Sequence, residues 1–169
     1  MPNSGRPPAR EGISPRKTVL RGYVPEKGEY FAARAGDSPY PPGALLPAGA
    51  ELPRPVPAWY HPTVPAERPI PFDYSVIYAD RDLIVVDKPH FLPTTTNGRL
   101  QRETLQTRLR VDFGEDDIVP LHRLDRLTAG LVLCSRNLAT RAAYQRIFGK
   151  GSAVKRYRGV VKRPLYVDR

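Results

Sequence analysis

A run of ten residues, HRLDRLTAGL at 122–131, places one carboxylate among basic side chains. Asp125 follows Arg123 by two residues and directly precedes Arg126, and a Thr-Ala-Gly turn then leads into the apolar residues 131–134. Scaffolds tend to present reactive groups where polar residues enter a buried strand. The residue types alone nevertheless favour a plainer interpretation, in which Asp125 caps a turn or pairs with a neighbouring arginine at the surface.

The same run is similar to a known catalytic motif. Seven of its positions match the H-R-L-D-x-x-T-S-G-L motif of the RluA-type family of RNA pseudouridine synthases, and Ala129 stands where that family has Ser. Two further segments resemble family landmarks in the expected order: a strand with a Lys-Pro turn in DLIVVDKP at 82–89, and a K-x-Y strand in VKRY at 154–157. The resemblance covers about residues 74–161.

The resemblance implies isomerisation of a specific uridine to pseudouridine in structured RNA, either ribosomal or transfer RNA. This reaction breaks the N1–C1′ bond, turns the uracil and rejoins it through C5, so it needs no cofactor and no metal. A single carboxylate must attack C1′ or remove the C2′ proton, and both roles require an ionised Asp against an oxocarbenium-like sugar. By resemblance, Asp125 is that catalytic carboxylate.

Two other functions compete with this one. The chain could be a catalytically inactive, basic RNA-binding fragment that uses the same surface. A metabolic enzyme with a basic phosphate-binding cleft is disfavoured, because the glycines form neither a dinucleotide fingerprint nor a P-loop.

The resemblance also assigns roles around the carboxylate. Because the target base must leave its helix, an aromatic ring has to hold it, and Tyr157 is the second catalytic candidate, able to stack and to assist proton transfer. An ordinary strand aromatic in the core is the alternative. Arg123 resembles the family arginine that approaches the RNA, although a phosphate contact or an ion pair would suit it equally. His122 is expected to orient its neighbours. The candidate RNA-binding residues are Arg123, His122, Thr128, Lys88 and Lys155, and the two lysines could also be plainly solvated.

Three departures from the family pattern carry consequences. Ala129 removes a hydroxyl that could orient the loop of Asp125. The Lys-Pro turn continues with HFLP at 90–93, where the family has a small, Gly-bearing segment, so a different packing is expected. The family's later basic motif, whose Arg pairs with the catalytic Asp, has no counterpart before Arg169. We therefore expect residues 1–169 to be a fragment of a longer enzyme or the product of a truncated gene, which the coding sequence after Arg169 would test.

The elements that must position these residues follow from periodicity and turn signals. Two β-branched runs separated by a turn predict two antiparallel strands, and apolar residues at i and i+4 predict helices. The expected order is strands at 76–78 and 83–86 around a turn at 79–82, a helix over 102–112, a strand at 131–134, a helix over 138–148 capped by Asn137, and a strand over 153–162. This order predicts an α+β domain with a mixed, mainly antiparallel sheet and flanking helices.

Proline usage divides the chain. Sixteen of the 20 prolines lie in residues 1–73, so the core-forming sequence must lie mostly in residues 74–169. We predict a disordered tail over 1–16 and a Pro-rich region over 17–73 that can hold a small module, with strand ends around a turn at 45–52 and a linker at 66–72. Residues 74–169 are predicted to be the N-terminal part of the catalytic domain.

The charge and the rare residue types indicate which partners and which cellular compartment to expect. The formal net charge is +10, and beyond residue 140 nine basic residues face only Asp168, which favours a polyanionic partner over a merely solvated surface. The single cysteine, Cys134, indicates a reducing compartment. Its apolar neighbours predict that it is a small buried residue. No spacing of His and Cys suits a metal, no apolar run approaches about 18 residues, and no signal core follows Met1. These features predict a cytoplasmic protein without metal or membrane partner.

Overall fold

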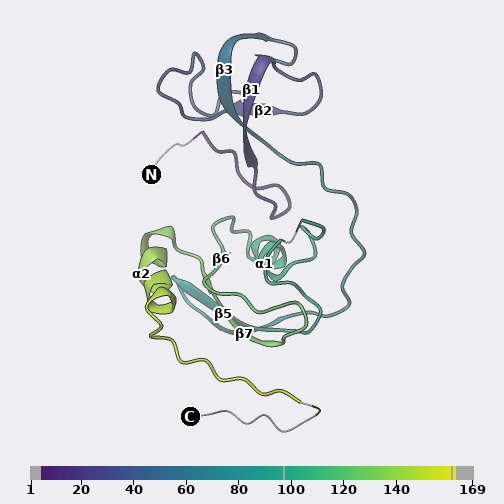
Figure 1. The fold of residues 1–169 in the computed structure, drawn as a ribbon, viewed down its shortest axis with the longest axis vertical. Helices are drawn as coiled ribbons and strands as arrows, with labels where there is room; N and C mark the ends of the chain where they lie inside the picture. The colour runs from purple at the N-terminus through teal and green to yellow at the C-terminus, as the bar shows by residue number, and fades with distance from the viewer. Residues whose placement is uncertain (1–4, 97, 161, 163–169) are drawn as a thin grey trace.

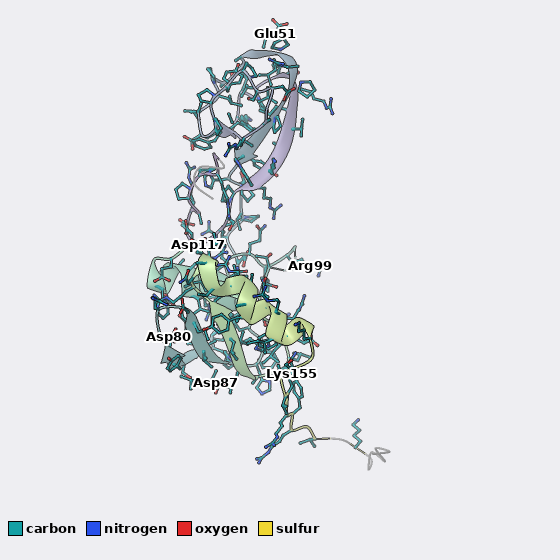
Figure 2. The ribbon with its side chains drawn as sticks, turned by 90° about the vertical axis from the view of Figure 1, so that its left-hand side faces the viewer. Glu51, Asp80, Asp87, Arg99, Asp117 and Lys155 are labelled. Carbon is teal, nitrogen blue, oxygen red and sulfur yellow. The ribbon has the colours of Figure 1, made fainter. Side chains whose placement is uncertain are left out.

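A computed structural model describes residues 5–96, 98–160 and 162. The chain builds two β-sheets, each with its own apolar core, and every strand pair in the described part is antiparallel. Two helices of the described part, α1 and α2, lie with the second sheet (Figure 1). Figure 2 shows an elongated molecule, with Glu51 at the tip of the first sheet and Lys155 toward the other end. The predicted α+β class is confirmed.

The first sheet has the strand order β1-β3-β2, with β1 at Arg16–Tyr23, β2 at Tyr30–Ala32 and β3 at Glu51–Tyr60. Its central strand contains three prolines, which sequence rules place at sheet edges. Pro57 is tolerated because its carbonyl, which accepts the N–H of Ala33 at 2.8 Å, faces the side where β2 pairs only with residues 58–60. Its ring nitrogen faces that same side, beyond the last paired residue of β2, so the ladder with β1 loses no hydrogen bond.

The second sheet has the order β4-β5-β7-β6 and carries the motif. Strand β4 covers Ser75–Ala79, β5 Leu83–Lys88, β6 Val119–Pro120 and β7 Gly130–Ser135. The central pair, β5 and β7, runs in register from Leu83 opposite Ser135 to Lys88 opposite Gly130. Alternate residues of both strands are buried with Leu105 and Leu109 of α1, and each such side chain contributes about 1.5–3 kcal/mol of burial free energy.

Both predicted helices form, with small differences at their ends. Helix α1 covers Leu105–Phe113 and α2 covers Leu138–Gly149, the latter capped by Asn137 as predicted. The first helix was expected from residue 102, but Thr104 is its N-cap, accepting the Thr107 N–H at 3.2 Å. The three preceding N–H groups, at residues 101–103, are instead bound by the carboxylate of Glu67, which keeps that turn out of the helix.

The predicted strand over 153–162 does not form in the described residues of that range. Residues 153–160 are extended but form no ladder, and residue 161 lies outside the described residues. Alternation of apolar and basic residues indicates a strand only when a neighbouring strand supplies hydrogen bonds, and no described strand pairs with this segment. The side chains of Val154 and Val160 are accordingly exposed.

Residues 5–15, which we call the N-terminal arm, differ from the disorder predicted for 1–16. The arm lies against α1 and the loop that follows it, where its polar groups find partners. The Ala9 N–H donates to Asp116 Oδ2 at 2.6 Å, and Arg110 of α1 donates to Ser14 Oγ at 2.8 Å. On the other side, His61 Nε2 lies 2.9 Å from the Pro8 carbonyl. The arm therefore bridges the two sheets.

The predicted linker is extended and firmly held. We call residues 66–73 the strap. Besides the contacts of Glu67, the Ile70 N–H donates to Glu103 Oε2 at 2.8 Å, and Arg108 of α1 donates to the carbonyls of Ile70 and Phe72, both at 2.7 Å. No helix among the described residues is both long and apolar enough to cross a membrane.

Candidate functional site

Asp125 lies in the loop of residues 121–129 that joins β6 to β7, here called the Asp125 loop. Its side chain is exposed, whereas the preceding residue, Leu124, is buried in the core. Thr94 fixes Leu124 from both sides: its buried hydroxyl donates to the Leu124 carbonyl at 2.7 Å and accepts the Leu124 N–H at 3.1 Å. The Thr128 N–H closes a turn onto the Asp125 carbonyl at 3.0 Å. The carboxylate is thus presented to solvent from a fixed backbone.

Lys88 is a buried cation that interacts electrostatically with the Asp125 carboxylate. It ends β5 opposite Gly130, and its ammonium donates to the carbonyls of Pro89 at 3.0 Å and Leu92 at 2.8 Å. Burial lowers the pKa of Lys88 below its usual range, and the negative charge of Asp125 partly offsets this shift. The prediction that Lys88 contacts an RNA phosphate is wrong for this structure, because the side chain is fully buried and its ammonium is held by backbone carbonyls.

The Asp125 carboxylate itself forms no hydrogen bond or salt bridge with any described side chain, so Lys88 acts on it only through space. Arg123 is likewise exposed, as an RNA contact requires. Its role, and that of Thr128, stay predictions.

The segment after the Lys-Pro turn is paired with the Asp125 loop. His90 Nδ1 lies 2.7 Å from the Leu127 carbonyl, the Phe91 N–H donates to the Arg126 carbonyl at 2.7 Å, and Arg126 Nε donates to the Phe91 carbonyl at 3.1 Å. Phe91 has a φ of 68°, a left-handed conformation that glycine adopts readily and a bulky residue rarely does. At HFLP, where we expected a difference from the Gly-bearing segment of the family, Phe91 is thus held in a conformation that suits glycine.

His122 connects the motif to β7. Its Nε2 accepts the Leu133 N–H at 3.1 Å, and its ring centroid lies 5.0 Å from that of Phe148 on α2. Burial lowers the pKa of His122, and the positive charge of Lys155 lowers it further. A ring whose Nε2 accepts a backbone N–H suits an orienting role more than a direct contact with RNA, and that role stays a prediction.

A pocket of about 360 Å³ brings the motif together with the other resemblance-based residues. It is lined by Tyr157 and Lys155 from the extended segment, by Phe148, and by motif and β7 residues including His122, Ala129 and Gly130. Lys155 Nζ lies 5.6 Å from the Phe148 ring centroid, and Tyr157 is 67% exposed. Asp125, Arg123 and Thr128 do not line this pocket, so the structure gathers one part of the predicted site and leaves the carboxylate beside it.

Two residues of this arrangement were missed from the sequence. Thr94 stands in a run of three threonines, and nothing in its spacing marks the one that binds Leu124. Phe148 was visible as an apolar position of the second helix, but its contact with His122 depends on the fold. No group of three or more His, Cys, Asp or Glu that could hold a metal occurs within the described residues.

Comparison with known proteins places the second part of the chain in a family. A family model described as RNA pseudouridylate synthase matches residues 82–168. An uncharacterized RNA pseudouridine synthase of Synechocystis is 34% identical over 103 residues, which are 61% of this chain and 35% of that protein. RNA pseudouridine synthase 5 of Arabidopsis thaliana is 30% identical over 67% of this chain and 32% of its own length. The tRNA pseudouridine(31) synthase of Saccharomyces cerevisiae is 27% identical over 53% of this chain and 22% of its own length.

The chain thus spans about a third or less of these relatives. The family match takes in the Lys-Pro turn, the Asp125 loop and the segment of Tyr157, and it covers more than half of the chain. This chain belongs to the RNA pseudouridylate synthase family.

Proposed function

We propose that this protein isomerises a specific uridine to pseudouridine in structured RNA, with Asp125 as the catalytic carboxylate. The observation that carries the proposal is the setting of Asp125: an exposed carboxylate on a backbone that Thr94 and the core hold in place. Such a group can reach a sugar that has been turned out of an RNA helix. The Lys88 ammonium is buried, so it leaves free the space beside Asp125 that the substrate needs.

The neighbouring residues supply binding and orientation. The Asp125 carboxylate attacks C1′ or removes the C2′ proton of the flipped nucleotide, and the N1–C1′ bond breaks with its electron pair leaving on the uracil. The turned uracil then forms the C5–C1′ bond, which releases the carboxylate or returns the proton to C2′, and the uracil loses its proton at C5 and gains one at N1. Tyr157, exposed at the mouth of the pocket beside the motif, offers a ring on which the uracil can stack. Arg123 offers a guanidinium to the RNA backbone, and His122 holds the loop against β7.

Ribosomal or transfer RNA is the substrate class that we propose. A yeast relative is named a tRNA pseudouridine(31) synthase, which supports a structured RNA of this kind. The net charge of +10 supports binding to a polyanion. We also propose a cytoplasmic location, which suits the single, buried Cys134, whose pKa burial raises to about 12.

Release of tritium from RNA labelled at C5 of uridine tests the proposal, because only isomerisation labilises that hydrogen. We expect release by the wild-type protein and none by Asp125→Asn, with RNA affinity unchanged within about twofold. Asp87→Asn is the matched control, since Asp87 is an exposed carboxylate on β5 next to Lys88, and it should release tritium at the wild-type rate. A fully active Asp125→Asn protein would contradict the assignment.

A second function, RNA binding without catalysis, is favoured by one observation. The Asp125 carboxylate makes no hydrogen bond or salt bridge with a described basic side chain, and such a partner would help to orient it. RNA binding by the 169-residue chain without any tritium release would support this alternative.

A further inference from the structure

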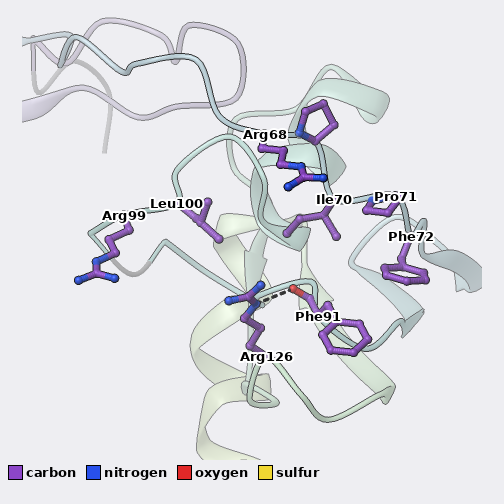
Figure 3. A pocket seen from close by; sticks show the side chains of 9 residues that line it. Arg68, Ile70, Pro71, Phe72, Phe91, Arg99, Leu100 and Arg126 are labelled. Atoms are coloured by element: carbon purple, nitrogen blue, oxygen red, sulfur yellow. Dashed lines mark hydrogen bonds between the residues drawn. The ribbon is translucent and has the colours of Figure 1, made fainter.

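A groove of about 610 Å³ lies between the strap, residues 99 and 100, and the pairing of Phe91 with Arg126 (Figure 3). We call it the arginine groove. It is lined by Arg68, Pro69, Ile70, Pro71, Phe72, Phe91, Arg99, Leu100 and Arg126. Its volume is in the range of pockets that hold small organic ligands. None of these residues lines the pocket of Tyr157, so the two cavities are separate.

The lining combines positive charge with aromatic and aliphatic surface. Three of the nine lining residues are arginines and none is acidic. The rings of Phe72 and Phe91 lie with centroids 5.5 Å apart, and each side chain is 44% exposed. Arginine beside an accessible aromatic face is the combination with which proteins bind single-stranded nucleic acid, because guanidinium groups contact phosphates and rings stack on bases.

The groove is already built before any ligand binds. Its strap wall is fixed by Arg108, which holds the carbonyls of Ile70 and Phe72 and pairs with Glu103. Its opposite wall is fixed by the hydrogen bonds between Phe91 and Arg126. Figure 3 shows Arg68 and Arg126 on opposite sides of the space, with Ile70 and Leu100 between them in that view. A preformed site loses less ordering free energy when a ligand binds.

The backbone of Phe91 is a second, independent indication of use. A bulky residue with a φ of 68° is strained by about 1–2 kcal/mol. Phe91 lines the groove and is 44% exposed, so its ring stays accessible to a ligand. Strained residues of this kind concentrate where a ligand is bound.

We propose that the arginine groove binds an unpaired nucleotide of the substrate RNA that flanks the target uridine. Its phosphate lies among the arginines and its base lies against Phe72. This rests on the proposed function, since Arg126 directly follows Asp125 and ties the groove to the Asp125 loop. A flanking nucleotide held here anchors the strand next to the nucleotide that has been flipped out.

Fluorescence anisotropy with a fluorescein-labelled dodecauridylate tests the groove in the full 169-residue chain. We expect Arg68→Gln and Phe72→Leu each to raise the Kd about five- to tenfold, as loss of a phosphate contact or of one stacked base would do. Arg81→Gln is the matched control and should leave the Kd within about twofold of wild type. Its side chain is 85% exposed and precedes β5, whereas the groove lies beyond the other end of that strand.

An abasic oligonucleotide of the same length separates stacking from phosphate binding. Arg68→Gln should weaken its binding as before, while Phe72→Leu should have no effect on it. As a further check, a 4-thiouridine in the RNA should crosslink to peptides containing residues 66–73 or 90–92. Unchanged affinity for dodecauridylate in both groove variants, or no RNA binding by the wild type, would overturn the proposal.

Tritium release distinguishes failure of this inference from failure of the proposed function. If isomerisation depends on Asp125 but the groove variants bind RNA with wild-type affinity, the groove proposal is wrong and the proposed function stands. RNA binding that depends on Arg68 and Phe72, without tritium release, would support the groove on a non-catalytic RNA-binding protein.

Discussion

At the level of single residues, the buried hydroxyl of Thr94 decides where Asp125 stands. It binds both backbone polar groups of Leu124, so the residue before the carboxylate cannot shift without losing two hydrogen bonds. Thr94 therefore fixes the backbone from which the Asp125 side chain extends.

Thr94→Val therefore tests whether this hydroxyl positions Asp125, because valine has nearly the same shape as threonine but no hydroxyl. It leaves the N–H and carbonyl of Leu124 unpaired in a buried place, and we expect a loss of about 1–3 kcal/mol in unfolding free energy by urea titration. The kcat for isomerisation should fall by more than the RNA affinity, because the carboxylate is displaced while the RNA-binding surface remains. Thr94→Ser should restore both, and Thr96→Val, at an exposed threonine nearby, should change neither. Wild-type stability in Thr94→Val would contradict the role given to this hydroxyl.

His122 makes stability depend on pH. Its folded-state pKa lies below the ordinary 6.5, because the ring is buried and Lys155 lies nearby, so on acidification the unfolded chain takes up a proton first. Its contribution is complete above about pH 6.5 and is lost as the pH falls through the folded pKa. Between pH 7 and 5.5, urea titration should show a falling free energy of unfolding for the wild type. His122→Gln, which stays uncharged, should show a flatter dependence, and an identical slope in the two proteins would count against this assignment.

At the level of elements, Arg108 of α1 holds the strap. Its guanidinium is largely buried, and it donates to two strap carbonyls and pairs with Glu103, whose side chain is only 18% exposed. Burial alone would raise the pKa of Glu103, but the Ile70 N–H and Arg108 outweigh it and hold the pKa below its usual range.

Arg108→Met should therefore lower the free energy of unfolding by about 2–3 kcal/mol, since it leaves the largely buried carboxylate of Glu103 without its cation. Amide hydrogen exchange should accelerate at Ile70, whose N–H is bound by Glu103, while Val132 in the sheet centre stays protected. Arg81→Met, at a mostly exposed arginine, should cost less than about 0.5 kcal/mol. Unchanged exchange at Ile70 would show that the strap does not depend on Arg108.

Much of the second sheet was predictable because its signals are local. The strands at 76–78 and 83–86, the strand at 131–134 and the cap at Asn137 all follow from neighbouring residues. The segment over 153–162 was not predictable, because a strand needs a partner that local alternation does not reveal. The strand at 51–60 was hidden by its prolines, whose tolerance depends on which side of the strand lacks a neighbour.

The site divides in the same way. The motif identified Asp125, and the fold decided what surrounds it. Lys88 is buried because it lies on the core-facing side of β5 with Ile84 and Val86, where backbone carbonyls bind its ammonium, which no count of charges could show. The bonds of Thr94 and the conformation of Phe91 likewise arise from segments that meet only in three dimensions.

At the level of the whole molecule, the N-terminal arm joins the two sheets, and Gly12 lets it approach α1. Gly12 has a φ of 72°, and a Cβ placed there would lie 2.7 Å from the Thr107 carbonyl oxygen. Both the conformation and the close approach require glycine at this position.

Gly12→Ala should release the arm from α1 without unfolding either core. The expected signature is faster amide exchange at Ile13, whose N–H donates to the Arg10 carbonyl at 2.9 Å, with unchanged protection at Val132. Gly36→Ala is the control, because a Cβ placed at Gly36 would meet no atom within 4 Å and the φ of this residue is not positive. Equal exchange at Ile13 in the two variants would mean that this contact does not hold the arm.

The central claim is that the Asp125 carboxylate performs the isomerisation. The most direct measurement is nucleoside analysis of a transfer or ribosomal RNA transcript after incubation with wild type, Asp125→Asn and Asp87→Asn, with RNA affinity recorded in the same samples. We predict pseudouridine with wild type and Asp87→Asn, and none with Asp125→Asn despite unchanged RNA binding. Pseudouridine formed by Asp125→Asn at the wild-type rate would contradict this claim.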